Sequence, residues 1–248
     1  MAVAEKIVYF TGCFANYYDP DVGKAFIAVM RRNGIDVLIP KQKCCGMPMM
    51  ANSNLKGAIK NARYNVESLA QAASPGYDIV TTCSSCNLML RREGLPFFDS
   101  EEARFVSNHT YDATEYLLKL HREGRLNTDF GELPLKLLYH NPCHLKVQNL
   151  TKEPVALLEL IPGLVVSKVS TDCCGMGGSY GMKKDNFDLS LEIAQKVWNE
   201  ANAAEVDRAV TECGGCKLQI EAGTGLTVVH PIVLVNEAYE AGEARKAA

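Results

Sequence analysis

The sequence has no excess of basic residues, no long apolar run and no nucleotide-binding fingerprint. Its 248 residues carry 26 Lys and Arg against 29 Asp and Glu, whereas nucleic-acid-binding domains are usually strongly basic. The longest apolar stretch, residues 155–166, contains Glu159 and is far short of the roughly 20 residues that cross a bilayer. No GxGxxG follows a strand, and no Walker spacing is present. We therefore expect no nucleic-acid partner, no transmembrane segment and no nucleotide site in this chain.

The first residues also lack the features of a secretory signal, because no basic region precedes an apolar segment and a cleavage site. We expect a cytoplasmic protein that reaches the inner face of a membrane only through partners. Structural disulfides are uncommon in a reducing cytoplasm, and a chain of this length can bury a core without them. The ten cysteines therefore indicate metal binding or redox chemistry.

The cysteines form two sets with the same spacing. Each set consists of a single cysteine, a Cys-Cys pair followed by glycine, and a CxxC motif, and the second set repeats the first after 129 or 130 residues. No cysteine falls outside the pattern. The sets are Cys13, Cys44, Cys45, Cys83 and Cys86, then Cys143, Cys173, Cys174, Cys213 and Cys216. This repetition indicates a duplicated unit.

The hydrophobic pattern repeats with the cysteines. Short β-branched runs that lead into cysteines alternate with helical periodicity, which predicts parallel strands joined by right-handed crossovers. We predict strands at 6–12, 35–40, 77–83 and 103–109 in the first half, and at 135–143, 164–174, 207–213 and 226–231 in the second. The expected fold is α/β, with two pseudo-symmetric Rossmann-like halves that are each a small parallel sheet flanked by helices. We place these domains at 1–129 and 130–248, with the polar stretch 121–134 as linker.

Each cysteine set is expected at the carboxyl edge of its sheet, where ligand sites of open α/β sheets form. Disulfides fit poorly, because neighbouring cysteines rarely bond to each other without strain. Zinc accepts CxxC pairs but needs only four ligands, which leaves one thiol over. Iron–sulfur clusters accept all-thiolate shells, although a common four-iron cube also needs only four. The fifth cysteine is explained by none of these general alternatives.

The order of the motifs resembles the cysteine-rich CCG domain. Two such domains in tandem resemble a heterodisulfide reductase subunit, the lactate-oxidation iron–sulfur proteins, and the C-terminal part of an iron–sulfur subunit family of anaerobic glycerol-3-phosphate dehydrogenase. The last resemblance is the strongest of the three and rests on NYYDPDVGKAF, KCCGMPMMAN, YHNPCH, CCGMGGSYGMKKDN and CKLQIE. The ferredoxin-like CxxCxxCxxxCP runs of that family are not in these 248 residues. Either the chain is part of a longer subunit, or the ferredoxin is a separate partner.

The resemblance implies two [4Fe-4S] clusters of the non-cubane type, one for each set of five cysteines. It implies an iron–sulfur redox subunit that passes electrons between a flavin dehydrogenase, similar to glycerol-3-phosphate dehydrogenase, and an acceptor such as quinone. The implied partners are a flavoprotein dehydrogenase subunit and a ferredoxin-like iron–sulfur subunit. The alternative is a catalytic disulfide reductase, similar to the heterodisulfide reductase subunit, that uses the clusters itself on a disulfide substrate. A zinc-binding interaction module remains a third possibility.

Residues around the second set suggest further roles. Gly175, Gly177 and Gly178 would let the backbone approach cluster sulfurs, or they form a flexible turn. His144 is a candidate proton donor and His140 a weaker one, although either can be structural. Lys183 would place positive charge near the cluster, or it is solvated surface.

The first set has methionines and a proline where the second has glycines. We therefore expect the second site to be open to a substrate or partner, and the first to act as a relay.

Overall fold

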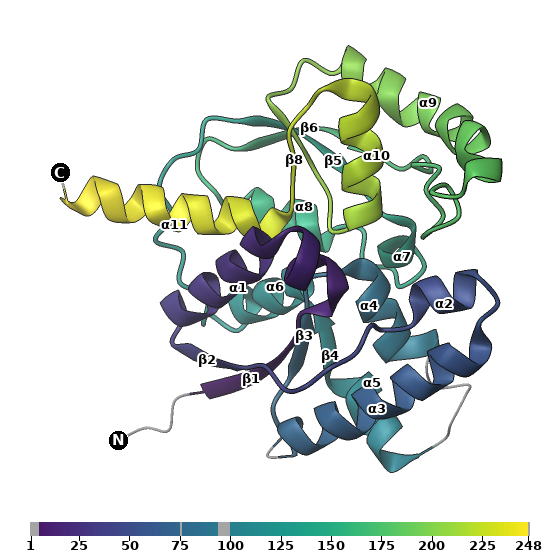
Figure 1. Cartoon of the computed structure of the whole chain (residues 1–248). Coiled ribbons are helices and arrows are strands. Elements are labelled where there is room, and N and C mark those ends of the chain that lie inside the picture. The colour runs from purple at the N-terminus through teal and green to yellow at the C-terminus, as the bar shows by residue number, and fades with distance from the viewer. Residues whose placement is uncertain (1–4, 75, 94–99, 248) are drawn as a thin grey trace. The chain divides into compact units, whose positions relative to one another are not determined.

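The computed structural model describes residues 5–74, 76–93 and 100–247, and the chain divides into two compact units, Met1–Asn127 and Thr128–Ala248. Each unit contains one four-stranded sheet in which all pairings are parallel (Figure 1). The predicted α/β class, with two small parallel sheets flanked by helices, is confirmed.

The sheet of the first unit has the strand order β2-β1-β3-β4. Its strands are β1 Glu5–Phe10, β2 Ile35–Leu38, β3 Ile79–Thr81 and β4 Thr110–Asp112. The helical segments are η1 Phe14–Tyr18, α1 Pro20–Arg32, α2 Met47–Ala51, α3 Leu55–Ala73, α4 Ser84–Leu88, η2 Met89–Glu93, α5 Glu101–His109 and α6 Ala113–Arg122. Strand and helix alternate in the order that crossover connections require.

Alternation along β1 divides the core of the first unit into two layers. Val8 and Phe10 point into the cluster made with α3 and α5, which includes Leu69. Tyr9 points the other way, and its ring lies 4.4 Å from that of Phe26 on α1. All of these side chains are fully buried, and full burial of one such side chain contributes about 1.5 to 3 kcal/mol. This packing holds the carboxyl edge of the sheet in place.

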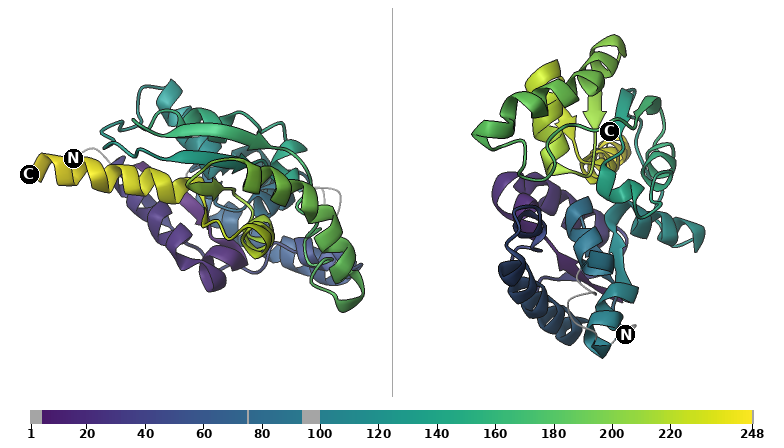
Figure 2. Two further views of the ribbon diagram at one scale, coloured as in Figure 1. Left: turned by 90° about the horizontal axis from the view of Figure 1, so that it is seen from above. Right: turned by 90° about the vertical axis from the view of Figure 1, so that its right-hand side faces the viewer.

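The sheet of the second unit has the matching order β6-β5-β7-β8. Its strands are β5 Lys136–His140, β6 Val165–Ser170, β7 Arg208–Val210 and β8 Val228–Val229. The helical segments are α7 Cys143–Lys146, α8 Glu153–Leu158, η4 Lys184–Asn186, α9 Phe187–Ala203, α10 Gly214–Thr224 and α11 Pro231–Ala247. Helices α9 and α10 lie side by side and pack against β5, β7 and β8 (Figure 2).

The predicted strand at 103–109 is wrong, because these residues belong to helix α5. Ser100 caps this helix by accepting a hydrogen bond from the backbone N–H of Ala103. Ala103 and Val106 are buried three residues apart, which is a helical spacing. The fourth strand of the first unit is instead β4, which starts directly after α5 and ends at Asp112.

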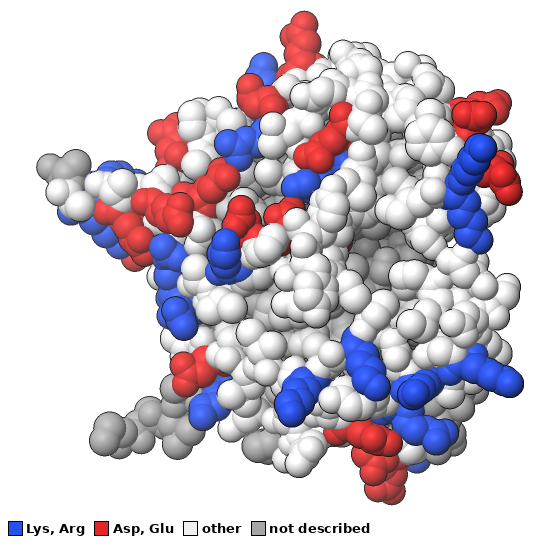
Figure 3. All heavy atoms as spheres, in the orientation of Figure 1, with Lys and Arg blue, Asp and Glu red and all other residues white. Residues whose placement is uncertain are grey.

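The surface is mixed in charge. Basic and acidic side chains both appear on the face of each unit that Figure 3 draws, in keeping with the near balance of 26 and 29 charged residues. Within the described ranges, none of the helices has the length and apolar character that a membrane span requires.

Candidate metal centre

The five cysteines of the first set come together at the carboxyl edge of the first sheet. Cys13 follows β1, the Cys44 and Cys45 pair lies on the loop after β2, and Cys83 and Cys86 begin α4 after β3. The thiols form a continuous chain of hydrogen-bonding neighbours, from Cys13 to Cys44, Cys45, Cys86 and Cys83. The structure therefore gathers the whole predicted set at one place.

The second set has the same placement after β5, β6 and β7. The Cys174 and Cys216 sulfurs are 3.2 Å apart, and Cys213 contacts Cys216. Cys143 contacts Cys173 and lies within electrostatic range of Cys174. All ten cysteines of the chain carry free thiols.

Each set has a buried and an exposed side. Cys45, Cys86, Cys174 and Cys216 are buried, whereas the other thiols are partly or fully exposed. The exposed ones are Cys13, Cys143 and Cys173. Each set is thus anchored inside its unit and reaches the surface through its exposed cysteines.

Neighbouring sulfurs strongly shift the pKa values of several thiols. The Cys216 thiol lowers the pKa of Cys174 to about 5, against the effect of burial. The Cys86 thiol similarly lowers the pKa of Cys83 to about 7. The pKa of Cys216 and that of Cys86 are raised in return, because each keeps its S–H in hydrogen bonding with neighbouring sulfurs. A bound metal would favour the thiolate form of each cysteine that coordinates it.

Backbone N–H groups point at the sulfurs in the same way in both units. Cys44 accepts from the N–H of Gly46, and Cys173 accepts from that of Gly175 at 3.4 Å. The second cysteine of each pair accepts from the N–H two residues later, at Met47 and Met176 respectively. N–H donors to sulfur are a main means by which proteins stabilise thiolate-bound clusters.

The three predicted glycines of the second loop all have positive φ angles. Gly175 has φ +83°, and a Cβ atom there would come within 2.2 Å of the Ser190 carbonyl oxygen on α9. Gly177 and Gly178 also have positive φ, and a Cβ on Gly177 would lie 3.2 Å from Tyr180. Close packing against α9 thus requires Gly175, while its N–H faces Cys173. A cofactor-binding role of the three glycines stays a prediction.

Of the two predicted histidines, His140 lies in a close group with two of the sulfurs. Lys183 is exposed, and His144 is half-buried in α7. His140 is only 1% exposed, and one of its ring nitrogens, Cys174 Sγ and Cys216 Sγ lie within 4.8 Å of one another. The roles of His144 and Lys183 stay predictions. His140 was the weaker candidate because it lies on a strand, yet the end of that strand is where the sulfurs gather.

Two polar side chains of the first unit support the site and were missed from the sequence. Asn65 is fully buried, accepts from the N–H of Lys43 at 2.8 Å and donates to the Lys43 carbonyl at 3.1 Å. Gln42 accepts hydrogen bonds from the Gly12 N–H and the Thr11 hydroxyl, each at 3.2 Å. The available signal for Gln42 was its place two residues before the Cys-Cys pair.

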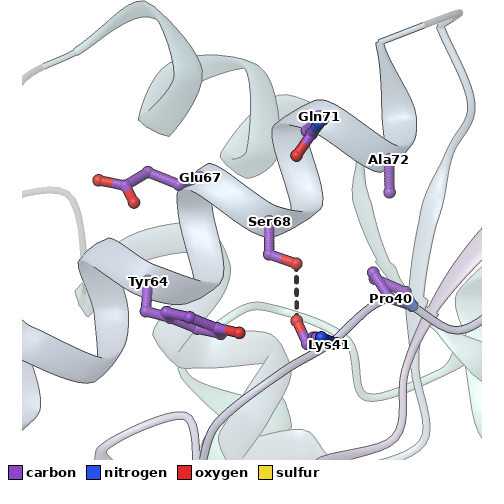
Figure 4. Close-up of a pocket in the computed structure, with 7 residues that line it drawn as sticks. All are labelled: Pro40, Lys41, Tyr64, Glu67, Ser68, Gln71 and Ala72. Atoms are coloured by element: carbon purple, nitrogen blue, oxygen red, sulfur yellow. Dashed lines mark hydrogen bonds between the residues drawn. The ribbon is translucent and has the colours of Figure 1, made fainter.

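A pocket of about 430 Å³ lies beside the loop after β2 (Figure 4). Tyr64, Glu67 and Ser68 of α3 line it, and the Ser68 hydroxyl donates to the Lys41 carbonyl at 2.6 Å. No cysteine lines this pocket. The thiol sets therefore remain the candidate site.

Comparison with known proteins shows similar chains in oxidoreductases and iron–sulfur proteins. A subunit of the anaerobic glycerol-3-phosphate dehydrogenase of Escherichia coli is 37% identical over 94% of this chain and 59% of its own length. A subunit of the fumarate reductase (CoM/CoB) of Methanothermobacter marburgensis is 31% identical over 87% of this chain and 42% of its own length. An uncharacterized iron–sulfur protein of Methanocaldococcus jannaschii is 30% identical over 87% of this chain and 41% of its own length.

The chain therefore spans less than two thirds of the length of each of these relatives. The cysteine-rich domain family CCG matches residues 7–91 and again residues 137–221, one match in each unit. Each match includes all five cysteines of its set. The chain belongs to the cysteine-rich CCG domain family and carries two copies of that domain.

Proposed function

We propose that this chain is the iron–sulfur subunit of an oxidoreductase complex. In this role it passes electrons from a flavin dehydrogenase, similar to glycerol-3-phosphate dehydrogenase, to a downstream acceptor such as quinone. The observation that carries the proposal is the gathering of five free thiols at the carboxyl edge of each sheet. The similarity to a subunit of the E. coli dehydrogenase supports it.

The thiol sets fit iron–sulfur clusters. All-thiolate donors suit iron and sulfide, and each set offers one more thiol than a tetrahedral zinc site uses. We assign one four-iron, non-cubane cluster to each set. The first set is Cys13, Cys44, Cys45, Cys83 and Cys86, and the second is Cys143, Cys173, Cys174, Cys213 and Cys216. When bound, such a cluster supplies one-electron exchange at a potential that the protein tunes.

The residues around the sulfurs would stabilise added negative charge. The N–H groups of Gly46 and Gly175 donate to Cys44 and Cys173. Cys83 additionally accepts from the N–H groups at the start of α4. The exposed cysteines of each sheet edge provide the side on which a partner can approach. The chain itself would thus supply the thiols that bind the cluster, the N–H groups that offset its negative charge and the exposed cysteines that a partner can reach.

The proposed partners are a flavoprotein dehydrogenase subunit and a ferredoxin-like iron–sulfur subunit. Contact with a membrane, at its inner face, would then occur through these partners. The relatives that are named as subunits support an assembly of this kind. A disulfide reductase activity of the chain alone is not favoured by these relatives.

Anaerobic purification with iron, sulfide and zinc analysis tests the cofactor. Two four-iron clusters predict about eight irons and about eight sulfides per chain. Stoichiometric zinc without sulfide would contradict the proposal.

A second experiment tests the electron path. A co-purified flavoprotein, supplied with glycerol 3-phosphate, should bleach the cluster absorption of this chain. Disulfide turnover by the isolated chain with an artificial electron donor, and no reduction by a flavoprotein, would support the reductase alternative instead.

A further inference from the structure

The two cysteine sets differ in one buried residue at the end of the central strand. Tyr9 of β1 pairs with Val80, and Tyr139 of β5 pairs with Val210, so these two tyrosines occupy equivalent positions. The next residue is Phe10 in the first unit and His140 in the second. Both side chains are buried, to 0% and 1% exposure. The second set therefore has a polar ring where the first has an apolar one.

His140 lies against the most buried part of the second set. One ring nitrogen, Cys174 Sγ and Cys216 Sγ fall within 4.8 Å of one another, so the ring lies beside the Cys174 sulfur. Phe10 packs in the corresponding cluster of the first unit with Cys45 and Cys86, and its ring has no donor to offer. The arrangement of sulfurs is shared, whereas the N–H group beside them is not.

One nitrogen of the buried His140 ring is left without a hydrogen bond in the described part of the chain. Nδ1 of His140 is buried and has no hydrogen-bond partner among the described residues. A buried polar atom without a partner costs roughly 1 to 3 kcal/mol, so packing alone would favour an apolar side chain such as Phe10. A function in the second set accounts for the histidine better than a structural role does.

We propose that His140 donates a hydrogen bond to the Cys174 sulfur and thereby raises the reduction potential of the cluster held by the second set. This inference rests on the proposed function. Donors to ligand sulfur stabilise the reduced cluster more than the oxidised one, because the reduced cluster carries more negative charge. His140 is a positioning and tuning residue here, since it acts through the Cys174 sulfur.

A direct bond from His140 to iron is the competing assignment. The first set has the same five cysteines and does without a histidine at this position, so the thiols alone complete the common arrangement. The neutral imidazole ring carries one N–H, which is what a donor to sulfur needs. The shared cysteines therefore favour hydrogen bonding by His140, and the experiment distinguishes this role from ligation of iron.

The experiment compares the anaerobically purified wild type with His140→Phe, His140→Gln and the control His121→Phe. His121 is an exposed residue of α6 in the first unit. Iron and sulfide are measured first, and the two midpoint potentials are then determined by redox titration followed by EPR.

We expect full iron content throughout and a lower potential for one cluster in His140→Phe. The ratio of reduced to oxidised cluster at a fixed potential should fall about tenfold, which corresponds to about 59 mV for one electron. His140→Gln retains an N–H and should recover part of the shift, and His121→Phe should show none.

Two results for the His140 variants would overturn the inference. Unchanged potentials in iron-loaded His140→Phe exclude the donor role, while loss of about half the iron in both His140 variants indicates a ligand. If His140→Phe does not fold, pulsed EPR on ¹⁵N-histidine-labelled wild type distinguishes a hydrogen bond to sulfur from a direct bond to iron. A weak ¹⁵N coupling supports a hydrogen bond through sulfur, whereas none, or the strong coupling of a bound nitrogen, contradicts it. A wild type without iron and sulfide would instead overturn the proposed function, and this inference with it.

Discussion

Gly12 lies directly against Cys86. A Cβ atom built on Gly12 would come within 2.8 Å of the Cys86 sulfur, and Gly12 has φ +65°, a conformation that other residues adopt reluctantly. The glycine is held there by Gln42, whose side chain accepts from its N–H. The turn before Cys13 is therefore shaped by a sulfur that follows more than 70 residues later in the chain.

Gly12→Ala should disable the first cysteine set and leave the second intact. The added methyl group would push Cys86 out of place, so we expect the iron content to fall from about eight to about four per chain. Gly34→Ala is the matched control, because Gly34 has φ +72° but nothing within 4 Å of a Cβ. It should cost roughly 1 kcal/mol of stability and no iron. Equal iron loss in both variants would show that backbone strain, and not the contact with sulfur, is responsible.

Cys86→Ser and Cys216→Ser should each remove one cluster. The two sets lie in separate compact units, so each variant is expected to retain about four irons, and the two should differ in which EPR signal is lost. Loss of all iron from either single variant would contradict the assignment of one cluster per set.

Asn65→Ala should loosen the Cys-Cys-Gly loop of the first unit. Asn65 is buried and bonds to the N–H and carbonyl of Lys43, next to Cys44. Losing these bonds should lower the free energy of unfolding by about 2 kcal/mol, measured by denaturant titration of the metal-free protein. Iron release from the first set to a chelator should also become faster. Asn52→Ala is the control, because Asn52 is exposed and donates to the Pro48 carbonyl outside this loop. The Asn52→Ala variant should change neither the free energy of unfolding nor the rate of iron release.

Asp112 should make the stability of the first unit depend on pH. Burial raises the pKa of this carboxyl to about 6, although its hydrogen bonds from Thr114 oppose the shift. Because the folded state binds this proton more tightly than the unfolded state does, the contribution of Asp112 is greatest at low pH. It is lost as the pH rises from about 4 to about 6, by up to about 3 kcal/mol.

Asp112→Asn keeps the side-chain oxygen that caps α6 and removes the charge. The variant should match the wild type near pH 3, below the unfolded pKa, and be more stable near pH 7, as measured by denaturant unfolding of the metal-free protein. A difference that does not change with pH would contradict the assigned pKa.

Much of the architecture could be predicted from the sequence because it depends on local or repeated patterns. The spacing of the ten cysteines revealed two units, and strands running into cysteines predicted parallel sheets with the thiols at their carboxyl edges. The strand predicted at 103–109 failed, since a short run with Phe105 and Val106 fits a helix as well as a strand. The Ser100 cap and the packing of α5 against α3 stabilise the helical conformation of these residues.

The sequence by itself determined which residues are the candidate metal ligands, because the residue type and the duplicated spacing of the ten cysteines can be seen in the sequence. Only the tertiary structure decided what surrounds the sulfurs. His140 meets Cys174 and Gly12 meets Cys86 through contacts that join segments distant in sequence. Periodicity reports which face a residue occupies, whereas the direction of a side chain beyond the end of a strand depends on the loops and helices packed around it.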